Sequence, residues 1–252
     1  MKVPMILQKD RKQTDVFIGT AGWNLPKSLA EEFPGAGHWL ERYARRLNAV
    51  EINSSFYRLH KPETYAHWAS LTPPEFRFSV KIPRQITHFS GLRDLEALRR
   101  FHESTLGLEE KSGVWLIQLP PSLAFDRESA IRFFEAIRNL YQGDVVCEPR
   151  HPSWFTSSVA SLLDSLHIGR VAAHPAPHPE GERPAAWKGI VYYRLHGAPQ
   201  RYVSSYAPNY LEHLADEVRR LPPAVRVWIV FNNTAQGAAW ANALEMHRQL
   251  FS

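Results

Sequence analysis

The sequence predicts an α/β fold, specifically a single (β/α)8 TIM barrel, and three observations carry the prediction. Eight short apolar runs have the length of buried strands, and segments with helical spacing of apolar residues separate most of them. Nearly every run ends in a cluster of polar or charged residues, as strands do at the active face of such a barrel. The length of 252 residues is typical of one barrel domain.

In the first half of the chain, strands are expected where apolar runs end in polar residues, at residues 16–19, 49–52, 77–81 and 114–118. Helices are expected where apolar residues recur at helical spacing, at residues 38–47, 62–70 and 94–104. Leu95, Leu98 and Phe101 form one such stripe, and Pro62 suits the first turn of its helix.

In the second half, strands are expected at residues 144–148, 170–173, 190–196 and 226–231. Helices are expected at residues 126–140, 157–166, 208–220 and 236–250, the first of them capped by Asp126. The alternation breaks at residues 174–188, which contain Pro175, Pro177, Pro179 and Pro184. Because proline fixes φ and lacks an amide donor, we expect an irregular loop in place of the helix after strand six.

We expect residues 1–15 to form an N-terminal extension and residues 16–252 to form the barrel domain. The apolar stretch from Val3 to Leu7 is too short for a secretory signal and is soon followed by charges. No run approaches the ~18 apolar residues of a membrane span. The single cysteine, Cys147, excludes an internal disulfide and favours a reducing compartment. A cytoplasmic protein without membrane association is therefore expected.

Alternation along the strands predicts which side chains reach the mouth of the barrel. Phe78 and Val80 are apolar and suit the helix side, so Ser79 and Lys81 are expected to point inward. The same parity directs polar residues from other strands inward, namely Glu51, Asn53, Gln118, Glu148, Arg194, His196 and Asn232. These charges either form a satisfied ionic network or meet a ligand.

Several segments together resemble a known family: Gly19–Trp23, Val50–Tyr57, Phe76–Lys81 with Ile86–His88, Gln118–Pro121, Glu148–Trp154, Tyr193–Gly197, and Phe231–Thr234 with Ala241–Ala243. In this order they resemble the YecE-like family, also called the domain of unknown function 72. The resemblance covers about residues 16 to 250. It implies a TIM-barrel fold and, as the family's name states, no assigned reaction.

Two residues depart from the pattern of this family. Ala21 stands where a serine is expected in the glycine turn, and His174 stands near the place of a frequent aspartate after strand six. If that aspartate is catalytic or a ligand in relatives, the role is altered or lost in this chain.

The candidate catalytic residues are the titratable side chains near the mouth, Glu51, Lys81, Glu148, His151 and His196. Two carboxylates across a pocket divide acid and base roles when their surroundings separate their pKa values. The candidate substrate-binding residues are Trp23, Asn53, Tyr57, His88, Gln118, Arg150, Trp154, Arg194, Asn232 and Asn233. The aromatic members either stack on a sugar or base or pack the loop layer.

No cofactor is expected, and a divalent metal is the less favoured alternative. Glu51, Glu148, His151 and His196 are suitable ligand types. However, Lys81 and several arginines bring positive charge to the same mouth, and no compact metal-binding spacing of histidines occurs.

An anion is the favoured ligand, held by Arg194 together with the segment Asn232–Thr234 before the final helix. The competing arrangement is an internal bridge from Arg194 to Glu51 or Glu148. We therefore expect an enzyme, of hydrolase or lyase type, that acts on a small phosphorylated or carboxylated substrate through Glu148 with His151 or His196. The alternative is a non-catalytic module that binds nucleic acid or a nucleotide through a basic, aromatic-lined mouth. The net charge of +5 is too modest to favour it.

Overall fold

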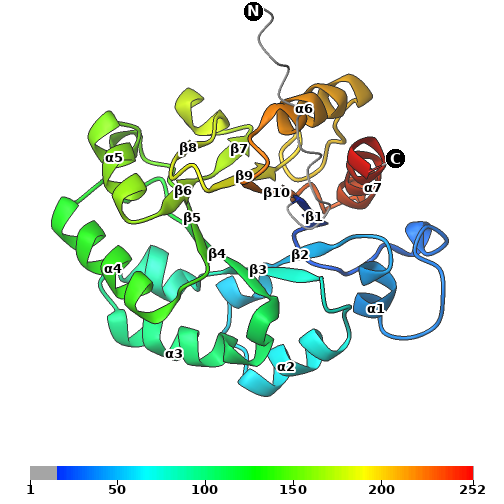
Figure 1. Ribbon diagram of the computed structural model, residues 1–252, viewed down its shortest axis with the longest axis horizontal. Coiled ribbons are helices and arrows are strands. Elements are labelled where there is room, and N and C mark those ends of the chain that lie inside the picture. The colour runs from blue at the N-terminus through cyan, green and yellow to red at the C-terminus, as the bar shows by residue number, and fades with distance from the viewer. Residues whose placement is uncertain (1–15, 252) are drawn as a thin grey trace, which may run out of the picture.

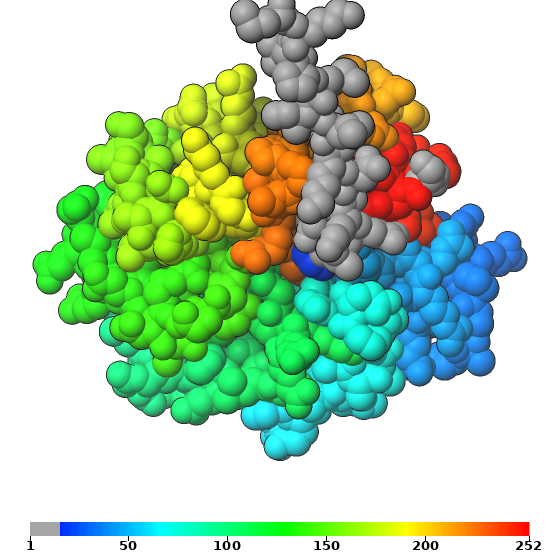
Figure 2. Space-filling model, in the orientation of Figure 1, coloured from blue at the N-terminus to red at the C-terminus, as the bar shows by residue number. Residues whose placement is uncertain are grey.

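The computed structural model describes residues 16–251, in which parallel strands occupy the centre and helices surround them (Figure 1). The expected extension, residues 1–15, lies outside the described residues. The first sheet has the order β1-β10-β9-β7, formed by Val16–Thr20, Arg226–Phe231, Ile190–Leu195 and Ala172–His174. All pairs in it are parallel, and the first strand, β1, pairs with the last, β10. In the space-filling view, the blue start of the described chain accordingly lies against the orange segment near its C-terminal end (Figure 2).

The second sheet has the order β2-β3-β4-β5-β6-β8. Its strands are Ala49–Ile52, Arg77–Lys81, Ser112–Gln118, Asp144–Glu148, Ile168–Arg170 and Ala185–Ala186. All pairs are parallel except β6 with β8. The helices are α1 (Trp39–Ala44), α2 (Pro62–Ser70), α3 (Leu95–Thr105), α4 (Arg127–Leu140), α5 (Ser157–Ser165), α6 (Pro208–Arg220) and α7 (Ala238–Phe251). An α/β fold with parallel strands is therefore confirmed.

Local sequence explains where several helices begin. Asp94 caps α3 by accepting a hydrogen bond from the Ala97 amide, and Asp126 caps α4 in the same way from Ser129. Thr156 caps α5 through the amide of Val159. The prolines Pro62 and Pro208 open α2 and α6, where a missing amide hydrogen has no cost.

Side chains supply most of the hydrogen bonds between β1 and β2, where the two sheets meet. Asn48 accepts from the amide of Ile18 and donates to the carbonyl of Val16. The hydroxyl of Tyr43 accepts from the amide of Thr20 and donates to the carbonyl of Ala49. The backbone bridge between β1 and β2 is a single parallel one, from Ala21 to Glu51. The strand pairing is thus that of two sheets, and a single closed barrel stays a prediction.

The proline-rich segment replaces a helix, as expected. Strand six, expected as one run at residues 170–173, is divided into β6 and β7 around Val171. Between His174 and Lys188 the chain forms only a short 3₁₀ turn, Pro179–Glu182, and the two-residue strand β8. No helix of the described residues is both long and apolar enough to cross a membrane.

The core has an outer and an inner part. The outer part lies between strands and helices and includes Cys147, whose parity directs it away from Glu148. The inner part contains inward-facing residues of both sheets, which are Phe17, Ala49, Val114, Leu116, Val146, Val171, Ala173, Ile190, Tyr192, Trp228 and Val230. Because both sheets bury their inner faces against one cluster, the carboxyl ends of their strands surround one common area.

Candidate functional site

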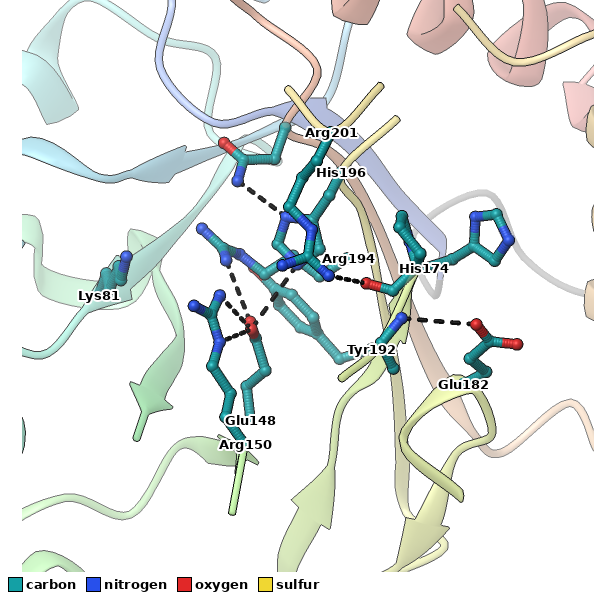
Figure 3. Close-up of polar contacts among 12 residues, drawn as sticks. Lys81, Glu148, Arg150, His174, Glu182, Tyr192, Arg194, His196 and Arg201 are labelled. Carbon is teal, nitrogen blue, oxygen red and sulfur yellow. Dashed lines mark hydrogen bonds and ion pairs between the residues drawn. The ribbon is translucent and has the colours of Figure 1, made fainter. Parts of the chain in front are cut away.

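A buried ionic network forms the base of the site, and Arg194 of β9 is its centre (Figure 3). Its Nε donates to Oε2 of Glu51 at 2.9 Å, and its Nη2 donates to Oε1 of Glu51 at 2.8 Å. Its Nη1 donates to Oε2 of Glu148 at 3.0 Å. This two-pronged contact with Glu51 is the geometry in which a guanidinium binds a carboxylate most strongly. Of the two arrangements expected for Arg194, a bound anion or an internal bridge to Glu51 or Glu148, the structure contains the internal bridge.

Each carboxylate of the network has further partners. Arg150 donates from both Nε and Nη2 to Oε1 of Glu148, at 3.1 and 2.8 Å. The hydroxyl of Tyr192 donates to Oε2 of Glu51 at 3.1 Å and lies 2.9 Å from the hydroxyl of Ser79. Both carboxylates are buried but well supplied with donors, as buried charges must be.

The network keeps both glutamates ionised. Burial is the largest single influence and raises the pKa of each carboxyl, but the charges and hydrogen bonds of Arg194 and its neighbours together outweigh it. The pKa of Glu51 is therefore lowered, and that of Glu148, which also faces Arg150, is lowered well below its usual value. A carboxylate with so low a pKa is a poor general acid at neutral pH.

His196 is held beside Glu148 in a neutral form. The amide nitrogen of Asn232 lies 3.0 Å from Nδ1 of His196, and Nε2 lies 3.6 Å from Oε1 of Glu148. Because an amide NH2 group only donates, Nδ1 is the acceptor and the proton lies on Nε2. Burial lowers the pKa of His196, which keeps the ring neutral near pH 7.

A cavity of about 480 Å³ lies directly on this network. Its lining includes the exposed Tyr57 and nine polar or charged residues from the strand ends and the loops that follow them. These nine are Asn53, Lys81, Arg84, His88, Gln118, Arg150, Arg194, Asn232 and Thr234. Phe56, Phe89 and Tyr202 complete the lining. Among the described residues that line the cavity, three are arginines and one is Lys81, and none is an aspartate or glutamate.

Lys81, at the end of β3, is the most unusual residue of the cavity wall. Its side chain is almost fully buried, with 4% exposed. Its Nζ donates to Oδ1 of Asn53 at 3.1 Å and lies 3.9 Å from the centre of the Phe56 ring. Burial, reinforced by Arg194 and opposed by Glu51 and Glu148, lowers its pKa to about 7. In Figure 3, Lys81 stands apart from the ion pairs, with no contact drawn to Glu148.

His88 faces the same cavity from a π-helical turn, Gln85–Phe89. Its Nδ1 lies 2.8 Å from the hydroxyl of Thr87, and its ring packs edge-on against Phe56. Burial and the neighbouring charge of Lys81 lower the pKa of His88 to about 4. The imidazole is therefore neutral near pH 7 and available as a hydrogen-bonding group.

The rim of the cavity carries exposed aromatic side chains and one arginine. Tyr57 is 62% exposed and Phe89 is 66% exposed. The guanidinium carbon of Arg84 lies 5.3 Å from the ring centre of each. Tyr202, which also lines the cavity, packs edge-on against His196. Exposed aromatic rings around a polar cavity are common at ligand sites.

The structure places four of the candidate residues elsewhere. His151 accepts from the amide of Ser153 and caps a short 3₁₀ turn, Pro152–Trp154. That turn directs Trp154 back into the helix layer, where its indole donates to the carbonyl of Leu123. Trp23 packs edge-on against Trp68.

Asn233 also serves the fold and does not line the cavity. Its amide nitrogen donates to the Ser204 carbonyl and to Asn242 of α7, at 2.9 Å each. Of the segment expected to bind an anion before the last helix, Asn232 and Thr234 line the cavity. Strand alternation past β10 turns Asn233 the other way.

Four cavity residues were not singled out from sequence: Phe56, Arg84, Phe89 and Tyr202. Phe56 and Phe89 adjoin the candidates Tyr57 and His88, so their segments carried a signal. Arg84 and Tyr202 lie in irregular segments, where no periodic pattern in the sequence predicts which side chains face the cavity.

The two residues that depart from the resemblance have structural contacts. His174 ends β7, and its Nδ1 lies 3.1 Å from the hydroxyl of Tyr206. Ala21 makes the bridge to Glu51. In the described part of the chain, histidine, cysteine and acidic side chains form no group of three or more suited to a metal ion.

Comparison with known proteins gives relatives that are similar in sequence. Two Escherichia coli proteins, both named UPF0759 protein YecE, are 31% and 32% identical over 186 and 142 residues. The matches cover 69% and 56% of this chain. This chain spans 66% of the length of the first relative and 50% of the second.

Solved structures agree with the observed fold. A DUF72 family protein from Enterococcus faecalis superimposes with a TM-score of 0.76 at 21% identity, covering 93% of this chain and 95% of that one. One from Thermotoga maritima superimposes with a TM-score of 0.75 at 26% identity, covering 94% and 99%. The family described as "Protein of unknown function DUF72" matches residues 17–252. The chain therefore belongs to the DUF72 family.

Proposed function

We propose that this protein is an enzyme that binds a small phosphorylated or carboxylated substrate in the cavity and uses Lys81 for proton transfer. The observation that carries the proposal is the cavity wall itself. Lys81 and three arginines line it, whereas the nearest carboxylates, Glu51 and Glu148, lie beneath it and are already paired. A cavity with this charge distribution favours an anion.

The protonation states favour Lys81 over Glu148 as the group that exchanges a proton. A general acid or base works best when its pKa is close to the working pH. The pKa of Lys81 is about 7, whereas that of Glu148 is far below its usual value. Glu148, which sequence reasoning favoured for proton transfer, instead fixes the positions of Arg150 and Arg194.

Arg150 is the best-placed anion ligand. It donates to Glu148 from Nε and Nη2, which leaves Nη1 directed elsewhere, and it lines the cavity. Arg84 on the rim and the amides of Gln118 and Asn232 add donors around the same volume. An arginine that is held by one carboxylate and retains free donors binds a second anion without much loss of side-chain freedom.

The proposal also takes the two sheets as one barrel wall of eight strands, with the cavity at its mouth. Two features support it. Val171 alone separates β6 from β7, so one chain segment passes from the second sheet to the first. At the other junction, Ala21 and Glu51 pair directly. In a barrel of this kind, the carboxyl ends of the strands carry the active site.

A panel of metabolites tests the proposal by thermal shift. Each phosphorylated or carboxylated compound is compared with its uncharged parent, and binding to the folded state raises the melting temperature. We expect stabilisation by at least one anionic member and not by its parent, and reduced stabilisation in Arg150→Gln. Arg219→Gln, on the exposed face of α6, is the matched control. Equal stabilisation by charged and uncharged compounds would refute the anion site.

Binding of nucleic acid or a nucleotide remains the second candidate, because Tyr57, Phe89 and Tyr202 expose rings around a basic cavity. Such rings stack on bases. Affinity that rises with the length of a single strand and falls steeply with salt would favour this function. Turnover of a small compound, lost in Lys81→Met, would favour the enzyme.

A further inference from the structure

Lys81 differs from every other described lysine by its position. The side chains of Lys27, Lys61 and Lys188 are exposed. Lys111 is partly buried, but its Nζ donates to the carbonyls of Ala69 and Thr72 and does not line the cavity. Nζ of Lys81 has a single side-chain acceptor, Asn53, and faces the cavity.

The surroundings of Lys81 favour an uncharged amine. Desolvation acts against the ammonium ion, and so do the guanidinium groups of Arg194 and Arg150. Glu51 and Glu148 act in the opposite sense, but both are paired with those arginines. A lysine that is desolvated and lies near other cations is the usual form of a nucleophilic lysine.

We propose that Lys81 is a nucleophile that forms an imine with the carbonyl carbon of a small anionic aldehyde or ketone bound in the cavity. The inference rests on the anion site proposed above and names the substrate class for it. The nitrogen lone pair attacks the carbonyl carbon, and the C=O π bond breaks to give a carbinolamine. The C–O bond then breaks, and the oxygen leaves as water with the two hydrogens that the amine nitrogen carried. The product is a C=N bond to Lys81, without any oxidation or reduction.

The residues around Lys81 suit this sequence of steps. Asn53 accepts a hydrogen bond from Nζ and fixes the direction of the amine. Phe56 covers one side of the amine, which limits its contact with water. His88 is neutral and Arg150 is charged, so the lining offers both a hydrogen-bonding group and a fixed cation for the anionic part of the substrate.

Reductive trapping tests the proposal on the full chain. The protein is incubated with glyoxylate, pyruvate or dihydroxyacetone phosphate and with sodium cyanoborohydride, which reduces an imine to a stable secondary amine. Peptide mass spectrometry then locates the adduct. With a pKa near 7, more than about half of Lys81 is neutral at pH 7.5, against about 0.1% of an ordinary lysine. We expect one adduct per chain, on Lys81, formed about a hundredfold faster than on Lys61.

Two variants and one further probe complete the experiment. Lys81→Arg keeps a long basic side chain but removes the primary amine, and should abolish the fast adduct, whereas Lys111→Arg should retain it. Propanal, an uncharged aldehyde, should label Lys81 at least about tenfold more slowly than glyoxylate. Modification spread evenly over the exposed lysines, with no excess on Lys81, would overturn the proposal.

Calorimetric titration with inorganic phosphate separates this inference from the proposed function. Phosphate binding that is weakened by Arg150→Gln, together with absence of a Lys81 adduct, overturns the nucleophile and leaves the anion site intact. Absence of phosphate binding, with no protection of Lys81 by phosphate, overturns the anionic substrate class and the proposed function with it.

Discussion

Two neighbouring groups of charges at the carboxyl ends of the strands are built in opposite ways. In the buried network, Glu51, Glu148 and Arg194 satisfy one another through short ion pairs. In the cavity wall above, Lys81 and Arg84 have no carboxylate partner among the described ion pairs, and Arg150 uses only part of its donors. The lower group therefore satisfies its charges internally, whereas the upper group keeps donors of Arg84 and Arg150 that no described carboxylate occupies.

The energetic consequences differ accordingly. A buried ion pair contributes little net stability compared with apolar residues, but removal of one partner leaves an uncompensated charge. A cation without a partner in a cavity costs stability, and a bound anion removes that cost. Substitutions in the two groups should therefore affect folding and binding to different extents.

Arg194→Met should have the largest effect on folding. It leaves both Glu51 and Glu148 buried without their shared cation, and we expect a loss of about 3–5 kcal/mol in the free energy of unfolding. Urea denaturation measures this loss. Arg219→Met breaks an ion pair with Asp216 that is about half exposed, and should cost less than about 1 kcal/mol. Similar losses for the two variants would contradict the division between network and surface.

Lys81→Met should change how stability depends on pH. The pKa of Lys81 is lowered to about 7 in the folded protein, whereas the unfolded chain titrates near its ordinary value of 10.5. Between these values the unfolded state binds more protons, so the stability of the wild type rises with pH. Between pH 7 and pH 9, the titration of Lys81 should raise the free energy of unfolding of the wild type by about 2–3 kcal/mol.

The variant lacks this rise. The free energy of unfolding of the variant should therefore exceed that of the wild type most at and below pH 7, and the excess should shrink toward pH 10. Denaturation at several pH values measures the difference. Curves that stay parallel across this range would mean that Lys81 titrates as an ordinary lysine.

Arg150→Gln should separate binding from stability. We expect about tenfold weaker phosphate binding, since one charge-assisted contact is worth about 1.5–3 kcal/mol and water replaces part of it. Glu148 keeps its bond to Arg194, so the stability loss should stay near 1 kcal/mol. Calorimetry and urea denaturation of the same sample provide both values. A loss in the free energy of unfolding as large as that of Arg194→Met would mean that Arg150 serves the buried network and not ligand binding.

His151→Ala should have the smallest effect. His151 caps the turn Pro152–Trp154 outside the cavity, so phosphate affinity should not change. Loss of the cap should cost about 0.5–1 kcal/mol in stability. A marked drop in phosphate affinity would show that His151 contributes to the anion site.

Most elements follow from the sequence because the signals are local. Leu98 and Phe101 are buried on α3 and Leu95 packs partly buried against the same core, and Asp126 caps α4, as expected. The four prolines between His174 and Lys188 excluded an α-helix there. Strand alternation correctly directed Lys81, Glu148 and Arg194 toward one area, because a period of two is imposed by the extended backbone itself.

Other features follow from no local pattern. The short turn after β5 reverses the chain within three residues, so Trp154 enters the helix layer although it closely follows Glu148. The contacts of Asn48 and Tyr43 across β1 and β2 replace backbone pairing with side chains, which strand periodicity does not reveal.

Local patterns in the sequence predict most of the elements and the polar side chains that meet at the strand ends. Which charges pair in the buried network and which line the cavity depends on the tertiary structure. Arg194 meets Glu51 across 143 positions of sequence and Glu148 across 46. Ion pairing depends on distances of a few ångströms and on depth below the surface, and both arise only when distant strands pack together. The same packing withdraws Lys81 from water, and so converts an ordinary lysine into the one described lysine that faces the cavity with a pKa near 7.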